Sequence, residues 1–474
     1  MTTKSQPRTL LKRSGRANPP SAENPVRLTA STTNASPARL VIALVLGAAL
    51  SWLVLGNSLL AYLSDAEPDF VVSAGAATAR ALTVLADRSV GRKIDATRKD
   101  DTAAKVAPDA GLAAPDSVLS DDDIKAYAKR ALAADPFNAR AIRILGQAAI
   151  LNGDKVEASR LMTAALQRDV HEYRAAAWLL QDSYERSDKP GMAKYAQTLL
   201  MTNSITRPYV VQVLAKLAED PAGRKELVGL LADDPRWRGM VLGMLPARTP
   251  DARSVFLVLQ DLKDTPNPPT SQDVSTYLTF LMTNKLYDFA YYVWLQFLPP
   301  EQLESLGLLN NGTFETPLAG GPFDWTLAQG SGSTVKIENT QNPDGHALYV
   351  EFGLGRVNFG GVKQTLMLGP GAYKLSGAYK GEMRAVRGLE WRIACLAKPA
   401  AVLSATEMFT RAAPGWTPFE LTFTVPAEGC VGQSLSLVLN ARLQSERILS
   451  GSLWFDDLAI AAVPVEAAAT QPTP

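Results

Sequence analysis

The pattern of apolar and polar positions changes character along the 474 residues of the chain. Residues 40–63 form one unbroken apolar run. Residues 120–300 place apolar side chains at the three- and four-residue steps of amphipathic helices. Residues 308–462 instead alternate apolar and polar positions between Gly and Pro turns. These patterns predict a multidomain chain with a single transmembrane helix, an all-α helical-repeat solenoid and a C-terminal all-β sandwich.

The run from Leu40 to Leu63 contains no charged residue, and about 20 apolar residues suffice to span a bilayer. Residues 1–39 carry seven cations against one anion and few large apolar residues, which is typical of a disordered basic tail. Cations before the run and acids after it, from Asp65 onward, place the N-terminus in the cytoplasm. We expect a single-pass inner-membrane protein whose bulk is periplasmic. A cleaved signal peptide is the alternative.

Two further segments lack a strong pattern. Residues 64–119 are rich in Ala, Asp and small polar residues, and they predict a linker with one helix over Val71–Val90. Residues 463–474 predict a disordered tail.

The helical segment begins at Ser120, a residue suited to capping a helix, and its acidic turn residue recurs 34 positions apart at Asp135 and Asp169. Residues 131–139, with Leu145-Gly146 and Ala158, resemble tetratricopeptide repeats over about 118–205. The resemblance implies stacked helix pairs whose groove holds a protein partner. A generic helical bundle is the alternative for 120–300.

Four segments of the C-terminal region resemble, in order, the galactose-binding-like jelly roll of carbohydrate-binding modules of the 4/9 type. They are Leu309–Glu315, Gln364–Ser376, Gly415–Pro426 and Leu453–Ile460. The resemblance covers about 308–462 and implies a jelly-roll sandwich with a polysaccharide as ligand. The same fold also hosts protein-binding and purely structural modules.

The resemblance also implies a structural calcium where the first and last strands meet, with Glu315 and Asp456 as oxygen ligands. Hydrogen bonding at the sheet edge is the alternative role for these two side chains. No other cofactor is expected.

Planar polar and aromatic side chains suit the recognition of sugars. Trp391 shares one strand face with Leu389 and Ile393, so it is expected in the core, while Glu390 and Arg392 point outward. The predicted carbohydrate-binding residues are Arg356, Asn358, Tyr379, Arg384, Glu390 and Arg392.

Cys395 and Cys430, the only cysteines, predict a disulfide in an oxidising compartment, with two free buried thiols as the alternative. The net charge of +1 gives no case for nucleic acid.

His171 and His346 lack neighbours at metal-ligand spacing, and no nucleophile motif is present, so no catalytic residue is predicted. We expect a non-catalytic envelope protein that acts in polysaccharide synthesis or export. A pure protein-interaction scaffold and a cryptic glycan-active enzyme are the alternatives.

Overall fold

The computed structural model describes residues 37–99, 119–341, 344–396 and 401–463. Residues 1–36 of the predicted basic tail, residues 100–118 of the linker and residues 464–474 of the C-terminal tail lie outside these ranges. The chain divides into two compact units, residues 1–85 and 86–474. The helices are α1 Pro37–Ala66, α2 Pro68–Ser73, α3 Ala79–Lys99, α4 Asp121–Ala134, α5 Ala139–Leu151, α6 Lys155–Arg168, α7 Tyr173–Glu185, α8 Lys189–Thr202, α9 Arg207–Ala218, α10 Pro221–Ala232, α11 Arg238–Met244, α12 Arg253–Leu262, α13 Ser271–Thr283, α14 Tyr287–Gln296 and α15 Pro300–Glu304.

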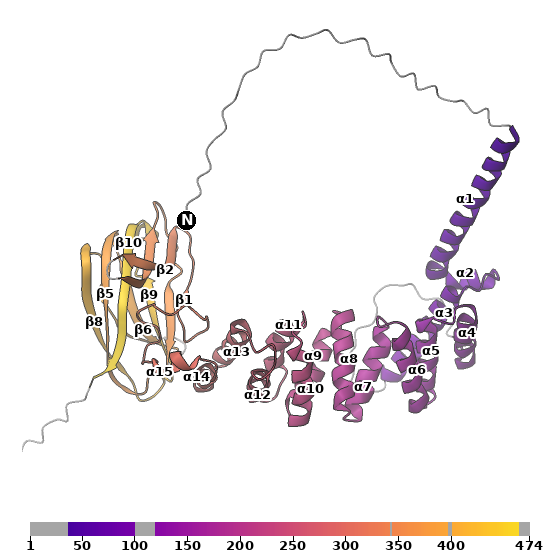
Figure 1. The fold of residues 1–474 in the computed structure, drawn as a ribbon, viewed down its shortest axis with the longest axis horizontal. Helices are drawn as coiled ribbons and strands as arrows, with labels where there is room; N and C mark the ends of the chain where they lie inside the picture. The colour runs from indigo at the N-terminus through magenta and orange to yellow at the C-terminus, as the bar shows by residue number, and fades with distance from the viewer. Residues whose placement is uncertain (1–36, 100–118, 342–343, 397–400, 464–474) are drawn as a thin grey trace, which may run out of the picture. The chain divides into compact units, whose positions relative to one another are not determined.

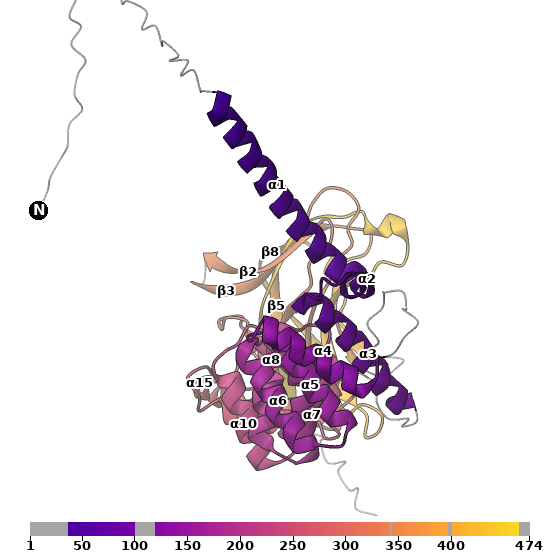
Figure 2. The same cartoon turned by 90° about the vertical axis from the view of Figure 1, so that its right-hand side faces the viewer.

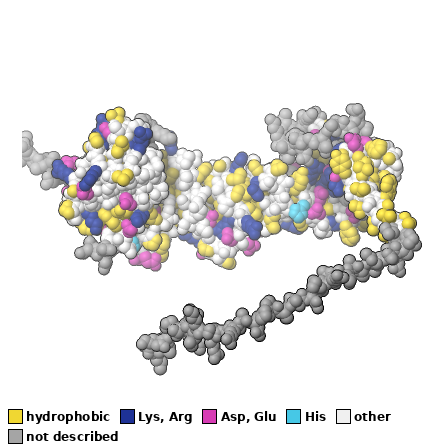
Figure 3. All heavy atoms as spheres, turned by 90° about the horizontal axis from the view of Figure 1, so that it is seen from above, with side chains coloured by type: hydrophobic (Ala, Val, Ile, Leu, Met, Phe, Trp, Pro, Cys, Tyr) yellow, Lys and Arg dark blue, Asp and Glu magenta, His cyan; other side chains and the backbone are white. Residues whose placement is uncertain are grey.

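The apolar run forms one unbroken helix, α1 (Figures 1 and 2). Its segment Val41–Ala66 has a mean hydropathy of 1.9 and is long and apolar enough to cross a membrane. Hydrophobic side chains gather over α1 (Figure 3). After α1 the chain turns, and Arg80 donates to the carboxylate of Asp65, 2.7 Å from Nε to Oδ1. The helix is therefore compatible with a single membrane span.

From α4 to α9, every second helix starts at a constant interval. The first helices of three successive pairs start at Asp121, Lys155 and Lys189, and their partners start at Ala139, Tyr173 and Arg207. Every step is 34 residues, and consecutive helices pack on one another (Figure 1). The register is lost at α10, which starts at Pro221, only 32 residues after Lys189. The 34-residue spacing read from the sequence is therefore a spacing of helix pairs.

Local capping explains why these helices begin where they do. The side chains of Ser120, Asp154 and Asp188 accept backbone N–H groups at the starts of α4, α6 and α8. Small residues allow the close approach of consecutive helices, since a Cβ at Gly146 of α5 would lie 3.2 Å from Met162 of α6.

Helix α3 differs from the prediction, because it begins at Ala79 and continues past Gly91 to Lys99. Its carboxylate Asp87 is buried and accepts from Arg140, Arg143 and Arg174, at 2.7, 2.8 and 3.0 Å. Arg143 is also buried, and it donates to Glu172 at 2.6 Å. The helix predicted within the linker segment is thus fixed to α5 and α7 by a buried ionic cluster that the sequence did not predict.

Residues 326–462 form a sandwich of two five-stranded antiparallel sheets, as predicted. Sheet A has the order β1-β4-β9-β6-β7, and sheet B has the order β2-β3-β10-β5-β8. The inner faces bury one apolar core that includes Trp325, Trp391 and Phe455. The strands are β1 Thr326–Leu327, β2 Ser333–Gln341, β3 Asp344–Phe352, β4 Val362–Leu366, β5 Gly371–Arg384, β6 Leu389–Cys395, β7 Val402–Ala405, β8 Ala413–Val425, β9 Gln433–Leu439 and β10 Ser450–Ala462.

The motif Asn311–Glu315 is a turn and not the first strand that the resemblance implied. Asn311 and Phe314 both have positive φ, at 49° and 57°, which excludes an extended strand. Gly312 accepts the N–H of Leu458 at 3.0 Å, and a Cβ at Gly312 would lie 1.8 Å from the carbonyl oxygen of Leu458. Only glycine allows this approach. The motif therefore joins the start of the sandwich to β10, although it does so as a turn.

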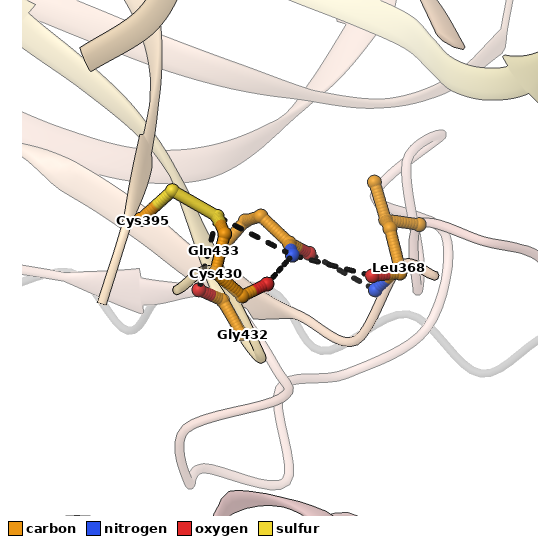
Figure 4. Close-up of a disulfide and its surroundings, with 5 residues drawn as sticks. All are labelled: Leu368, Cys395, Cys430, Gly432 and Gln433. Carbon is orange, nitrogen blue, oxygen red and sulfur yellow. Dashed lines mark hydrogen bonds between the residues drawn. A yellow bond between two sulfur atoms is a disulfide. The ribbon is translucent and has the colours of Figure 1, made fainter. Parts of the chain in front are cut away.

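Cys395 and Cys430 form the predicted disulfide, which links the end of β6 to the loop before β9 (Figure 4). Gln433 lies beside it, where its amide donates to the carbonyl of Cys430 at 2.8 Å and accepts the N–H of Leu368 at 2.9 Å. The bridge and this glutamine together fix three separate stretches of chain at one end of sheet A.

Candidate functional site

A row of small polar and cationic side chains crosses the outer face of sheet A. Side chains that face each other across antiparallel strands point to the same side of a sheet. The inner neighbours Val362, Leu437 and Trp391 are fully buried, so the next residue along each strand faces outward. The outward row, named here the sheet A row, consists of Thr326, Lys363, Ser436, Arg392 and Ala405.

Glu390 and Arg392 lie on this face, as predicted, but Glu390 is only 5% exposed. Its Oε1 accepts from Arg392 Nη2 at 2.6 Å, and its Oε2 accepts from Asn440 Nδ2 at 2.5 Å. The side chain of Arg392 remains 36% exposed. Glu390 therefore orients the guanidinium, and Arg392 is the member of the pair that a ligand would meet.

A shallow hollow of about 140 Å³ adjoins this pair. Asn358 and Arg447 line it together with Val438, which pairs with Glu390 across the sheet. Small-molecule pockets enclose roughly 300–1,000 Å³, so a sugar chain would lie across this surface and would not be enclosed. Arg356 is exposed on the loop that leads to Asn358, and it forms a β-bridge with Ile448.

Two of the predicted sugar-binding residues do not belong to this face. The ring of Tyr379 packs against Phe409, at 4.7 Å between centroids, and against Phe455 in the core, because its position in β5 points inward. Arg384 projects from sheet B near Glu382 and is exposed. The sequence placed these residues on strands but did not show which sheet or face each strand would supply.

Glu315 and Asp456, the two predicted calcium ligands, lie close enough for their charges to interact. Glu315 accepts the backbone N–H of His346 at 2.8 Å and contacts the His346 ring at 2.9 Å, which lowers the pKa of Glu315. Burial, with the charges of Asp457 and Glu315, raises the pKa of Asp456 to about 6. Asp457 has a φ of 54° at the irregularity in β10. Within the described ranges, no group of three or more His, Cys, Asp or Glu side chains could hold a metal.

The raised pKa of Asp456 predicts a pH dependence of the sandwich. The folded state holds this proton more tightly than the unfolded state, where the ordinary value is 3.8. The free energy of unfolding should therefore fall as pH rises from about 4 to about 6, and then level off. Asp456→Asn should remove this slope in urea denaturation at a series of pH values with a chelator present. The same pH profile in the variant and the original chain would contradict the assignment.

The same denaturation with Ca²⁺ in place of the chelator tests the predicted calcium. Glu315 and Asp456 supply two carboxylates, so calcium here would need further oxygen atoms from the main chain or water. If calcium binds, Ca²⁺ added at a pH above 6 should raise the urea midpoint of unfolding of the original chain. It should leave the midpoint of Asp456→Asn unchanged. An unchanged midpoint in the original chain would contradict calcium binding at this site.

No family model matches this chain, and no curated protein matches it in sequence. Solved carbohydrate-binding modules are similar to its C-terminal region. A family 4 module is 18% identical, with 33% of this chain and 99% of the module covered at a TM-score of 0.25. A family 61 module in complex with β-1,4-galactotriose is 15% identical, with 33% and 99% covered, at a TM-score of 0.23. A xylan-binding domain from Paenibacillus barcinonensis is 14% identical, with 32% and 93% covered, at a TM-score of 0.22. Likeness at this level assigns no function, which has to come from the residues themselves.

Several residues of the outer face were missed in the sequence. Lys363 and Ser436 join Arg392 only through the pairing of β4 and β9 with β6, and Asn440 reaches Glu390 from 50 residues away. Each is an ordinary polar residue in its own strand or loop. The pairing order of the strands was the missing information.

Proposed function

We propose that the sandwich binds a glycan on the outer face of sheet A. The observation that carries the proposal is the guanidinium of Arg392, which is held in place by the buried carboxylate of Glu390 and stands beside the hydroxyl of Ser436. A fixed fork of N–H donors suits hydroxyl and carboxylate oxygens. The sheet A row holds no aromatic ring, so recognition here would depend on hydrogen bonds and charge.

The charge of this face favours an acidic glycan. Lys363, Arg392 and Arg447 supply three cations, and Glu390 is the carboxylate set among them. A surplus of cations attracts a polyanion and makes its binding sensitive to salt. Sugars that carry carboxylates, such as uronic acids, fit this surface better than neutral sugars do.

Arg392→Ala is expected to weaken binding of an acidic polysaccharide by about tenfold or more, because hydrogen bonds to charged groups contribute roughly 1.5–3 kcal/mol. The measurement is calorimetric titration of the full chain in detergent with polygalacturonate and other uronate polymers. Binding to the unsubstituted chain should also weaken as salt is raised.

Two further variants make the result specific. Lys363→Ala removes a cation that is exposed, so it should weaken binding without leaving a buried carboxylate unpaired. Lys374→Ala, which removes an exposed lysine paired with Glu420 on β8, is the charge-matched control and should bind normally. If all three variants bind like the unsubstituted chain, sheet A is not the site. If the unsubstituted chain binds no acidic glycan, the pure scaffold becomes the better explanation.

The proposal extends to the rest of the chain. We take α1 as a membrane anchor with a cytoplasmic N-terminus, supported by the cationic surplus before it. The sandwich would then be periplasmic and non-catalytic, near machinery that makes or exports polysaccharide.

The helical region is proposed as a scaffold for a protein partner. Phe137 and Ile205 occupy equivalent positions of the first and third helix pairs, and they are 80% and 81% exposed. His171 occupies the same position in the second pair, so two of the three pairs present a large exposed apolar side chain there, which suits a docking surface. A partner that co-purifies with the unsubstituted chain but not with Phe137→Asp/Ile205→Asp would support this role, and equal recovery with both would sink it.

A further inference from the structure

A second row of side chains, named here the aromatic row, crosses all five strands of sheet B. Strand pairing places its members directly opposite one another up to Lys380, and contacts with Lys380 place the last one. The members are Lys336, Tyr349, Trp454, Lys380 and Trp416. Lys336, Tyr349 and Trp454 point outward, because Val335, Val350 and Leu453, their neighbours along the strands, are buried in the core. Lys380 contacts both Trp454 and Trp416, which places these residues on the same face.

The rings and cations of this row touch in sequence. The centroids of Tyr349 and Trp454 lie 4.5 Å apart. Lys336 Nζ lies 5.3 Å from the Tyr349 ring, and Lys380 Nζ lies 4.5 Å from Trp416 and 5.3 Å from Trp454. The three rings are half-buried and keep part of their surface in solvent. Neighbouring strands are about 4.8 Å apart, so the row is roughly 19 Å long, the length of a short oligosaccharide.

The positions on either side of the aromatic row are polar or small. On one side the register places Glu351, Ser452 and Glu382 in line across three strands. On the other side lie Glu338, Ala347, Asp456 and Ala378. Protein interfaces have apolar centres with few charged residues. The aromatic row is only one residue wide and has carboxylates directly beside it, so it does not resemble such a centre. It suits a ligand with apolar faces and polar edges.

A pyranose ring has this form, since its C–H face is apolar and its hydroxyls project around the edge. Four carboxylates, Glu338, Glu351, Glu382 and Asp456, lie beside three cations, Lys336, Lys380 and Arg384. This face therefore has no surplus of positive charge to attract acidic glycans, nucleic acid or anionic lipid. We propose that the aromatic row is a second glycan-binding surface, selective for neutral sugar chains that stack on Tyr349, Trp454 and Trp416. The two faces of the sandwich would then bind chemically different glycans.

This inference goes beyond the proposed function and does not require the sheet A site. The test is titration of the full chain in detergent with neutral xylo-, manno-, gluco- and galacto-hexaoses, followed by tryptophan fluorescence and calorimetry. We expect binding to at least one hexaose that changes little between low and high salt. Trp416→Ala should weaken it by about tenfold, the equivalent of one stacking contact of roughly 1.4 kcal/mol.

Trp416 is the better first variant because β8 is an edge strand, so its replacement disturbs the sheet least. Trp454→Ala should have a larger effect, and Trp454→Phe should restore binding if stacking is the cause. Arg392→Ala is the matched control from the other face and should bind neutral hexaoses normally.

Three outcomes would overturn the inference. Neutral binding that is lost in Arg392→Ala and retained in Trp416→Ala would assign it to sheet A alone. Self-association of the chain that Trp416→Ala abolishes, without sugar binding, would make the aromatic row an interface between copies. No response to any hexaose would leave the row as cross-strand packing. None of these outcomes tests the proposed binding of an acidic glycan to sheet A. That proposal is tested separately, by the effect of Arg392→Ala and Lys363→Ala on the binding of uronate polymers.

Discussion

Asp87→Ala is expected to lower the free energy of unfolding of the helical region by about 3–5 kcal/mol, the cost of breaking a buried ion pair by removing one partner. The carboxylate joins three helices, because Arg140 and Arg143 come from α5 and Arg174 comes from α7. Without it, Arg143 keeps only Glu172 as an anionic partner while remaining almost fully buried. Chemical denaturation followed by helical circular dichroism measures the loss.

The pKa of Asp87 supports this expectation. Burial alone would raise the pKa of this carboxyl, but Arg143, Arg140 and Arg174 outweigh burial and hold the pKa well below its usual range. The stabilisation is therefore fully present above the ordinary value of 3.8, and it is lost only as pH falls further. The difference between Asp87→Ala and the original chain should be constant from pH 5 to pH 8, the range where a buried but unpaired acid would instead titrate.

Two comparisons separate this cluster from ordinary surface charge. Glu157→Ala removes a carboxylate whose ion pair with Arg160 is exposed, and it should change stability little. Asp87→Ala/Arg143→Met removes the stranded buried charge as well, and it should recover much of the loss. An Asp87→Ala chain as stable as Glu157→Ala would contradict the assignment of the cluster as the link between α3 and the helix pairs.

Loss of the disulfide should destabilise the sandwich by about 3–4 kcal/mol, the chain-entropy value for a loop of this size. Cys395 and Cys430 are 35 residues apart, and the loop that they close contains β7 and β8. Cys395→Ser/Cys430→Ser should therefore shift the denaturation midpoint of the β domain. The reason is that opening this loop lets the unfolded chain gain conformations.

Reduction gives an independent control. A reductant should shift the midpoint of the original chain to that of the double serine variant, and it should leave the variant unchanged. Blocking free thiols in intact cells before lysis also tests the compartment, because the bridge should resist labelling if the sandwich lies in the periplasm. Free, reactive thiols on a folded chain would contradict both the bridge and that placement.

Elements with a strong period were predictable from the sequence. The apolar run, the 34-residue helix spacing and the alternation in Leu389–Cys395 each depend on neighbours within a few residues or on a fixed step. The core position of Trp391 and the outward position of Arg392 followed from alternation and are confirmed. The Cys395–Cys430 bridge, predicted from the count of cysteines and the expected oxidising compartment, is also confirmed.

What the sequence did not show depended on contacts between distant segments. The shared outward face of Trp454 and Trp416 does not follow from either strand alone, because single strands do not reveal that β10 and β8 lie on either side of β5. Tyr379 was interpreted as a sugar contact, although its neighbours Leu375 and Gly377 share its buried face. Asp87 lies in the predicted helix Val71–Val90, but its ion pairs are with arginines 53 to 87 residues away in the sequence.

The central claim is that the sandwich, and not the helical region, meets the glycan. Hydrogen exchange of the full chain in detergent, with and without a saturating bound polysaccharide, tests it most directly. We predict slower exchange in β6 and β9 with an acidic glycan and in β8 and β10 with a neutral one, with α4 to α14 unchanged. Protection confined to the helices, or none in the sandwich at saturation, would contradict the claim.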